Sequence, residues 1–407
     1  MGNLRRSKLF FCVFSLSMIL GLVIFRPSSQ ALSSEYKWPS TLSIGAPSIG
    51  TASYAGTVAW ATVMDKMTGM KIRVTPQVSW AEMERNLKHG TLDMILLPMS
   101  ETSFAVMASV PEHATREGGP FQVRVTWQLT TNAFSYFVRG DSDIKTVYDI
   151  RPEVKGKRKI AFPANIAVNK LSLVALLAFL NLEEKDAIWV PFGSHDAAMR
   201  AVAEGKADFN YANPEGSVIY EAEASQSGIR WIDLPVNKDP EGRERFLKVR
   251  PQVIFQKITC GVKSSHGVTG TISPNWYTVR DDTDPEFVYR FVKWLGENYD
   301  SYKNTHKVVE DYMNISSVRP TMDYIYLPIH KGAIRYFKEK GVWTPNDDAR
   351  QKYNTDLITR YEKAYKEAIA EADKKGIKID SRNKEWLDLW DNYRKQMPIL
   401  RVMHKIP

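Results

Sequence analysis

Patterns typical of strands and of helices alternate along this chain, and the alternation occurs twice. The first series, from Thr41 to Pro98, and the second, from Phe134 to Tyr211, both end in the order strand, helix, strand, helix, strand. Such an order favours a parallel sheet that is covered by helices. The chain has 407 residues, which is enough for two cores, since single cores rarely grow far past about 250 residues. The sequence therefore predicts two α/β lobes.

The order of the patterns also predicts where the lobes begin and end. After a strand pattern that ends at Arg280, the chain is expected to return to the first lobe. We expect lobe 1 to comprise residues 41–132 and 281–343, and lobe 2 to comprise residues 133–280. Residues 344–407 hold two amphipathic helix patterns and are expected to form a helical C-terminal extension. Because amphipathic stripes usually face a core, we favour a brace packed on its own lobe over a partner-binding arm.

The first 31 residues have the pattern of an export signal. A basic start is followed by an uncharged apolar run from Leu9 to Phe25 and by a stretch of small residues that ends at Ala31. We expect cleavage after Ala31. The apolar run is short for a bilayer span of about 20 residues, and an uncleaved N-terminal anchor is the alternative. In either case the rest of the chain is expected in the periplasm.

The charge balance excludes some classes of partner. Lys and Arg number 55 against 46 Asp and Glu, a net charge of +9, and four of the basic residues belong to the leader, which leaves +5 for the body. This mild charge without a basic cluster does not suggest a nucleic-acid binder, and it is compatible with anionic ligands. Removal of the leader would leave one of the two cysteines, Cys260, so no intrachain disulfide is expected.

No spacing of residues points to catalysis or to a metal. The chain lacks the usual zinc-peptidase, phosphate-loop, dinucleotide-binding and serine-hydrolase motifs, and no two of its seven histidines are three or four residues apart. His195 lies between Ser194 and Asp196, but these residues also begin a helix pattern, where Ser and Asp are ordinary caps. His330 heads another helix pattern and is interpreted as structural. We therefore expect a protein that is not an enzyme and needs no cofactor or metal.

Polar loops that lead into helices follow several of the predicted strands. In open α/β sheets, ligands bind at the carboxyl ends of strands, where helix N-termini offer free N–H groups to an anion. We expect these loops to converge on one cleft, with Trp80 and Trp127 as candidate apolar walls. Each candidate has an alternative role as a helix cap or a core residue. The predicted ligand-binding residues are Ser48, Thr51, Ser53, Tyr54, Ser79, Trp80, Met99 and Ser100 in the first lobe, and Pro163, Ala164, Asn165, Asn213 and Glu215 in the second.

Five segments between Leu42 and Trp343 carry motifs that occur together in one family. They are Leu42–Gly45 with Gly50 and Tyr54, then His89–Asp93, Lys159–Asn169, Ala203–Asp208 and, as the most specific, Leu327–Gly341. Together they resemble the extracytoplasmic solute receptors of TRAP transporters, specifically the TAXI family. The chain departs from that family in the ligand loops, where Pro47, Ser48 and Thr51 replace glycines of the first loop and Asn165–Val168 replaces the second motif. Because glycine lets a ligand approach the backbone closely, these changes predict a reshaped pocket, and the ligand cannot be carried over.

The resemblance implies a fold, a function and a partner. The fold is the type II periplasmic-binding-protein fold, in which two α/β lobes joined by a hinge close on a small solute. The function is capture of a small organic anion, a carboxylate or amino acid, and its delivery to the membrane permease of a TRAP-type secondary transporter. The alternatives are the binding protein of an ATP-driven importer or of a sensor, an enzyme on the same fold, and an adaptor that uses the aromatic C-terminal tail to bind a membrane partner.

Overall fold

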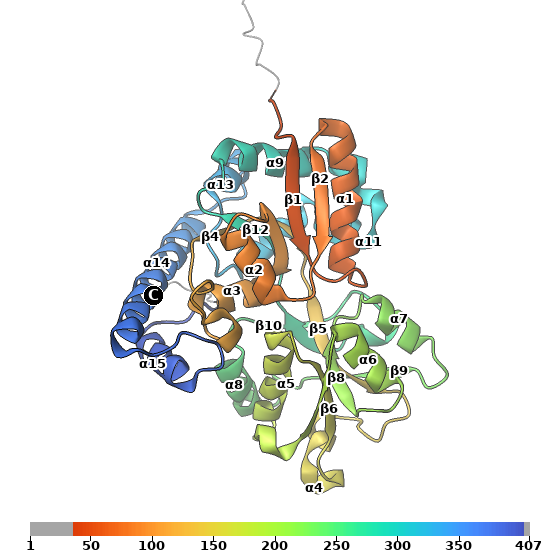
Figure 1. Cartoon of the computed structure of the whole chain (residues 1–407). Coiled ribbons are helices and arrows are strands. Elements are labelled where there is room, and N and C mark those ends of the chain that lie inside the picture. Colours follow the sequence, from red (N-terminus) through yellow and green to blue (C-terminus); the bar gives the residue numbers. More distant parts are fainter. Residues whose placement is uncertain (1–35, 403–407) are drawn as a thin grey trace, which may run out of the picture. The chain divides into compact units, whose positions relative to one another are not determined.

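Two β-sheets organise residues 36–402, the part of the chain that the computed structural model describes (Figure 1). The predicted leader at residues 1–31 lies outside this part. In the first sheet, β1 pairs in parallel with β2 and β3, whereas β12 runs antiparallel to both β3 and β4. Its five strands are, in spatial order, β2 (Lys71–Pro76), β1 (Thr41–Ala46), β3 (Met94–Pro98), β12 (Asn275–Arg280) and β4 (Val123–Thr130).

The second sheet has seven strands and mixes parallel and antiparallel pairs. Its path runs in the order β10-β11-β5-β8-β6-β7, and β9 pairs with β5 beside that path. β6 is parallel to β7 and β8, while β5 is antiparallel to β8, β9 and β11. The strands are β5 (Ala133–Arg139), β6 (Lys159–Pro163), β7 (Ile188–Phe192), β8 (Phe209–Ala212), β9 (Ile229–Ile232), β10 (Ile254–Lys257) and β11 (Thr269–Ile272).

The chain crosses between the sheets twice, after β4 at residues 131–132 and after β11 at residues 273–274. The second crossing corrects the predicted boundary at residue 280, because β12 belongs to the first sheet, where Tyr277 pairs with Leu96 of β3. A strand pattern shows that a segment is extended, but it does not show which sheet the strand joins. The predicted two α/β lobes and the helical C-terminal extension are confirmed.

Helices flank both sheets and form the extension (Figure 1). None of the helices within residues 36–402 is long and apolar enough to cross a bilayer. The α-helices are α1 (Ala52–Thr68), α2 (Trp80–Lys88), α3 (Met99–Met107), α4 (Pro152–Lys155), α5 (Ala167–Phe179), α6 (His195–Ala203), α7 (Ser217–Glu223), α8 (Pro240–Val249), α9 (Pro285–Glu297), α10 (Tyr299–Tyr302), α11 (Lys307–Tyr312), α12 (Ile315–Met322), α13 (Lys331–Glu339), α14 (Pro345–Lys375) and α15 (Lys384–Arg394). Short 3-10 turns lie at Pro111–His113, Val147–Ile150, Glu184–Asp186, Lys263–Ser265 and Lys303–Thr305.

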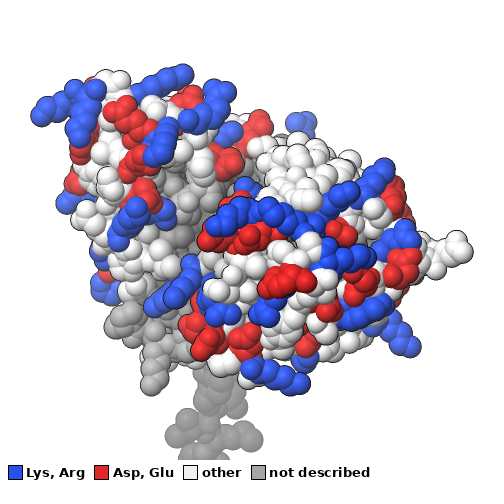
Figure 2. Space-filling model, turned by 90° about the horizontal axis from the view of Figure 1, so that it is seen from below, with Lys and Arg blue, Asp and Glu red and all other residues white. Residues whose placement is uncertain are grey.

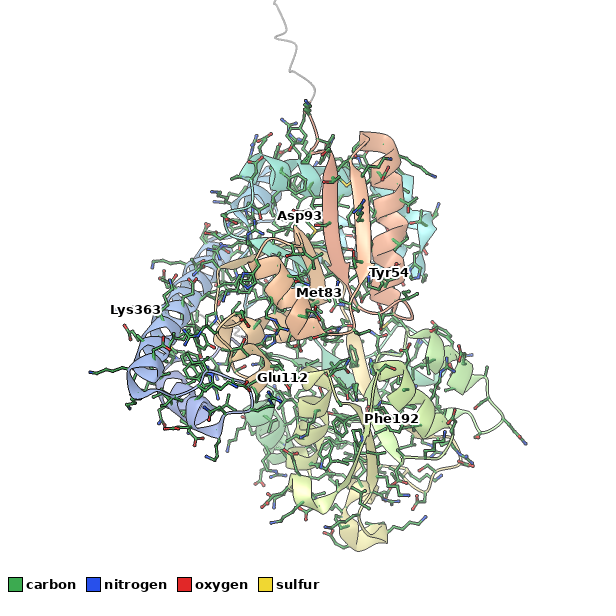
Figure 3. The ribbon with its side chains drawn as sticks, in the orientation of Figure 1. Tyr54, Met83, Asp93, Glu112, Phe192 and Lys363 are labelled. Carbon is green, nitrogen blue, oxygen red and sulfur yellow. The ribbon has the colours of Figure 1, made fainter. Side chains whose placement is uncertain are left out.

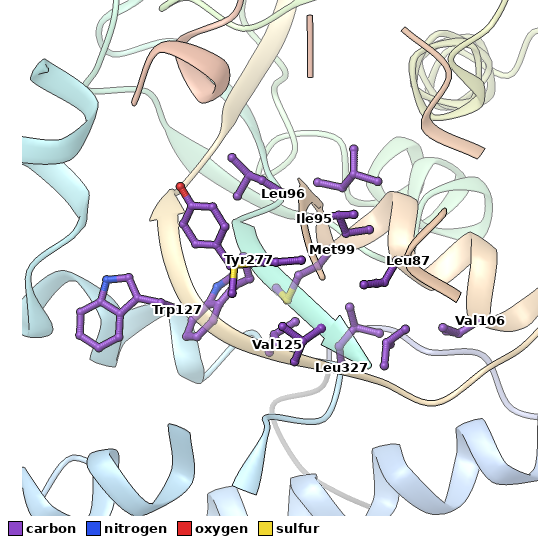
Figure 4. Close-up of a cluster of buried hydrophobic side chains, with 14 of the residues drawn as sticks. Leu87, Ile95, Leu96, Met99, Val106, Val125, Trp127, Tyr277 and Leu327 are labelled. Carbon is purple, nitrogen blue, oxygen red and sulfur yellow. The ribbon is translucent and has the colours of Figure 1, made fainter. Parts of the chain in front are cut away.

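The core of the first lobe is built from strands and helices that lie far apart in the sequence. Figure 4 shows one part of it, in which Leu87 of α2, Ile95 of β3 and Tyr277 of β12 lie in one cluster. Trp127 of β4 is fully buried there, and its ring stacks on Phe337 at a centroid distance of 5.9 Å. Its Nε1 donates to the carbonyl of Met313 at 3.2 Å. Trp127 is therefore a core residue, and its expected place in a ligand wall is wrong.

The extension packs on the first lobe, as the brace interpretation predicts. The indole Nε1 of Trp386 donates to the carbonyl of Ala114 at 2.7 Å, and that of Trp390 donates to the carbonyl of Ala108 at 2.8 Å. The hydroxyl of Tyr365 on α14 donates to the carbonyl of Thr115 at 2.8 Å. These three rings are buried in the same core as the first sheet, so α14 and α15 are part of the first lobe's hydrophobic packing.

One buried acid predicts how stability depends on pH. Glu84 of α2 is 1% exposed, and burial, together with the neighbouring Glu101 carboxyl, raises its pKa to about 8. As the pH rises from the ordinary value near 4.5 to about 8, the unfolded chain ionises this group while the folded chain keeps it protonated. The free energy of unfolding should therefore fall across that window.

Replacing Glu84 with Gln is expected to raise the melting temperature at pH 8 and to change it little at pH 4.5. A pKa difference contributes about 1.4 kcal/mol per unit, so the gain at pH 8 should amount to a few kcal/mol. Glu82→Gln, an exposed position on the same helix, is the control. An equal gain at both pH values would contradict this account of Glu84.

Candidate ligand-binding cleft

Two connected cavities lie between the lobes. Both are lined by Trp80 and Pro98 of the first lobe, by Asn132 at the crossing, and by Phe134 and His195 of the second lobe. The smaller one is here called the Arg250 chamber; it is also lined by Ser100, Ile166, Val168, Asn169, Tyr211, Arg250 and Ser273. The larger one is called the Asp196 chamber; it is also lined by Pro47, Gly50, Thr51, Ala52, Ser53, Asp196, Met199, Asn213, Gly216 and Asn275.

Helix N-termini are placed at this cleft by local capping. Thr51 accepts a hydrogen bond from the N–H of Tyr54 and begins α1, and Ser194 accepts one from the N–H of Ala197 and begins α6. Each cap ends the loop that follows a strand, β1 or β7, and the first turns of α1 and α6 line the Asp196 chamber from opposite lobes. The interpretation of Ser194 as a cap is confirmed.

A buried guanidinium lines the Arg250 chamber without a counterion. Arg250 follows α8, is 1% exposed, and donates from Nη1 to the carbonyl of Val168 at 3.0 Å and to the hydroxyl of Ser172. Its Nε has no hydrogen-bond partner. Within residues 36–402, no carboxylate lies within ion-pair distance, 4.0 Å, of this side chain. A buried charge without a partner is costly, and an anion in the chamber would offset that cost.

An aromatic wall runs along the second-lobe side of the cleft. The ring of Phe134 stacks on that of Tyr211 at 4.9 Å and lies nearly parallel to the ring of His195 at 6.3 Å. The Nε2 of His195 lies 3.2 Å from the carbonyl oxygen of Tyr211 and 3.4 Å from Nδ2 of Asn169. Burial lowers the pKa of His195, and the ring is therefore neutral near pH 7 and serves as part of the wall.

The lobes touch each other across the cleft mouth. Ser217 of α7 donates to the carbonyl of Gly50 at 3.3 Å, and Asn165 donates from Nδ2 to the carbonyl of Val78 at 3.1 Å. A Cβ at Gly50 would lie 2.7 Å from Oδ2 of Asp196, so the absence of a side chain there allows the second lobe to approach the first loop closely.

A family model matches residues 44–341, which include all residues that line the cleft and both sheets except the first three residues of β1. The chain belongs to the NMT1-like family. The matched region ends before α14, so the C-terminal extension of this NMT1-like chain lies outside the region that matches the family model. No curated protein sequence matches the chain.

Several solved structures resemble this NMT1-like chain, but with low sequence identity and low TM-scores. The periplasmic aliphatic sulphonate binding protein SsuA from Escherichia coli shares 15% identity at a TM-score of 0.41, with 79% of this chain and 87% of that chain covered. An ancestral arginine-binding protein bound to arginine shares 12% sequence identity at a TM-score of 0.42, with 67% of this chain and 97% of that chain covered. PhnD1 from Prochlorococcus marinus, in complex with methylphosphonate, shares 12% identity at a TM-score of 0.43, with 67% of this chain and 90% of that chain covered. Likenesses this remote say nothing about the ligand of this chain.

Some of the predicted ligand-binding residues line the two chambers of the NMT1-like cleft. They are Thr51, Ser53, Trp80, Ser100 and Asn213. Each of them belongs to a loop or a first helical turn that follows a strand, which is the position that the general rule for open α/β sheets predicts. Their role in binding stays a proposal.

The other first-lobe candidates do not line the chambers. The carbonyl of Ser48 closes the turn by accepting from the N–H and hydroxyl of Thr51. Tyr54, in the first turn of α1 (Figure 3), borders a separate surface groove between α1 and β2. Ser79 caps α2, and Met99 is buried in the first-lobe core.

In the second lobe, the remaining candidates are close to the cleft without lining it. Pro163 is buried at the end of β6, Ala164 is exposed, and Asn165 contacts the first lobe through Val78 as described above. Glu215 is mostly buried beside the crossing, and burial, followed by the charge of Asp311, raises its pKa to about 7.

Sequence reasoning missed several residues that line the cleft: Asn132, Phe134, Asn169, Asp196, Tyr211, Arg250, Ser273 and Asn275. Asn132 is the most informative, since it connects both crossings. It adopts a left-handed backbone conformation with φ of 53°, donates from Nδ2 to the carbonyl of Ser273 at 3.2 Å, and accepts from Nδ2 of Asn213. The boundary predicted between residues 132 and 133 falls at this crossing, but Asn132 was not predicted to line the cleft, although Asn between two strands is a common turn residue.

Proposed function

We propose that this protein is an exported receptor that captures a small organic anion, a carboxylate or amino acid, between its two lobes. The proposal assigns no catalytic step, metal or cofactor to the cleft. Membership of the NMT1-like family and the two-lobed fold with a cleft at the crossings support the receptor part. The export signal predicted at residues 1–31 supports a periplasmic location.

The observation that carries the choice of an anion is the unpaired guanidinium of Arg250. Its Nε–H and its charge are both buried, and no acidic side chain within residues 36–402 pairs with it. A ligand carboxylate would accept a charge-assisted hydrogen bond there, which is stronger than a neutral one. On the face in Figure 2, basic and acidic side chains are interspersed, so that face offers no comparable attraction for a polyanion.

We further propose that the receptor serves a TRAP-type permease, on the motif resemblance and above all on the segment Leu327–Gly341. An ATP-driven importer or a sensor is the alternative partner. Uptake of the ligand by cells that carry this receptor and the neighbouring permease genes would distinguish a TRAP transporter from an ATP-driven importer. Uptake through a TRAP transporter needs an ion gradient, whereas uptake through the importer needs ATP.

A thermal-shift screen of the purified protein tests the proposed function. The panel holds small carboxylates, amino acids and sulfonates, with the matching amides and alcohols as uncharged controls. A ligand that binds only the folded state at 100 times its Kd adds about 2.7 kcal/mol of stability, so a saturable rise in melting temperature is expected for an anion and not for its amide. No shift across the panel, from folded protein freed of carried-over ligand, would overturn the proposal.

A further inference from the structure

The Asp196 chamber contains an unpaired negative charge of its own. Asp196 lies in the first turn of α6, is half-buried, and makes no hydrogen bond or ion pair with any residue in the described range 36–402. Its carboxylate points across the cleft mouth to Gly50 of the other lobe. No Lys or Arg lines this chamber and the neighbouring His195 is neutral, so the carboxylate is offset only by the N-termini of α1 and α6 and by Arg200, which pairs with Glu221 outside the chamber.

Other polar atoms of the Asp196 chamber are also acceptors. Asn275 is 2% exposed and donates from Nδ2 to the hydroxyl of Ser53 at 2.8 Å, which leaves its buried Oδ1 without a partner. Together with the carboxylate of Asp196, this oxygen makes a surface that favours hydrogen-bond donors and positive charge. Unpaired buried acceptors cost free energy, and a ligand donor would remove that cost.

The two chambers therefore present opposite charges on either side of a shared wall. Arg250 and Asp196 do not pair with each other, and Trp80 and Phe134 line both chambers. A dicarboxylate held by Arg250 would place its second carboxylate near Asp196, and like charges brought together in an interface cost several kcal/mol. A cationic end is favoured there instead, both by the carboxylate and by the nearby aromatic faces.

We infer that the ligand is a zwitterion, with its carboxylate on Arg250, an apolar segment between Trp80 and Phe134, and an ammonium group in the Asp196 chamber. This inference rests on the proposed function and narrows it from small organic anions to amino carboxylates whose two charges lie at opposite ends. It also explains why the cleft keeps two unpaired charged groups of opposite sign.

Titration calorimetry on the full exported chain with matched probes tests the inference. For chains of three to eight carbons, the probes are the ω-amino carboxylate, the plain monocarboxylate, the dicarboxylate and the alkylamine. At the best length, the amino carboxylate is expected to bind at least tenfold more tightly than the other three. Asp196→Asn is expected to remove that advantage, whereas Glu204→Gln, at an exposed acid on the opposite end of α6, is expected to keep it. The melting temperature of each ligand-free variant checks that it is folded.

The outcomes separate this inference from the proposed function. Equal or tighter binding of the dicarboxylate, or a preference for the amino carboxylate that survives Asp196→Asn, overturns the zwitterion and leaves an anion receptor standing. If no carboxylate of any length binds, and the wider screen is also negative, both proposals fail.

Discussion

Replacing Arg250 with Gln is expected to weaken the binding of any carboxylate ligand by about 30-fold to several thousandfold, with little change in folding stability. Truncating one partner of a buried, hydrogen-bonded charge pair costs about 2–5 kcal/mol of binding free energy, and every 1.4 kcal/mol is a factor of ten in Kd. Stability should change by no more than about 1 kcal/mol, because the ligand-free protein loses a buried, unpaired charge together with the hydrogen bonds to Val168 and Ser172.

Arg245→Gln is the matched control for this prediction. Arg245 lies on α8, the helix that ends just before Arg250, and it also donates to main-chain carbonyls, those of Ala178 and Phe179 at 3.0 and 2.8 Å, but it does not line the cleft. Calorimetry would give the Kd, and denaturant unfolding would give the stability of each variant. Equal loss of affinity in both variants, or unchanged affinity in Arg250→Gln, would contradict the role assigned to Arg250.

These two arginines also show what the sequence could not reveal. Arg245 and Arg250 are five positions apart in the same stretch of sequence, but only Arg250 lines the cleft. Its position depends on the packing of α8 against α5, which brings the end of one helix to the start of the other. Such long-range packing leaves no local pattern, and the same holds for Asn275, whose place follows from the pairing of β12 with β3 and β4.

Features set by short stretches of sequence were predictable. The caps at Thr51, Ser79 and Ser194 follow from hydroxyl residues placed before helix patterns, and the apolar stripe of α14 predicts its packing. The alternation of strands and helices was enough to predict two α/β lobes and to choose the loops at their cleft. The direction of each side chain was not predictable, because adjacent residues in the first turn of a helix face different ways: Ser53 of α1 lines the cleft, whereas Tyr54 borders an outer groove.

The aromatic residues of the extension test whether it acts as a brace on the first lobe or as an adaptor that binds a partner. Trp390 is 2% exposed, its ring meets that of Tyr365 at 4.7 Å, and its Nε1 donates to the carbonyl of Ala108, which ends α3 with a φ of 41°. The indole thus supports a left-handed backbone position that is unfavourable for any residue with a side chain. α3 begins at the cleft with Ser100, so the extension also supports the far end of a helix that lines the Arg250 chamber.

Trp390→Ala is therefore expected to lower the free energy of unfolding by about 3–5 kcal/mol, the usual range for removing a fully buried aromatic ring. Trp189→Ala is the control, since Trp189 also donates from Nε1 to a carbonyl, that of Glu184 at 2.9 Å, but is only partly buried in the second lobe and should cost much less. Denaturant unfolding of both variants gives the comparison. If Trp390→Ala lowers the free energy of unfolding no more than the control does, and instead abolishes association with a membrane partner, the extension is an adaptor arm that leaves its lobe. A large decrease in the free energy of unfolding means that the aromatic face of the extension is packed in the core and is not free to bind a partner.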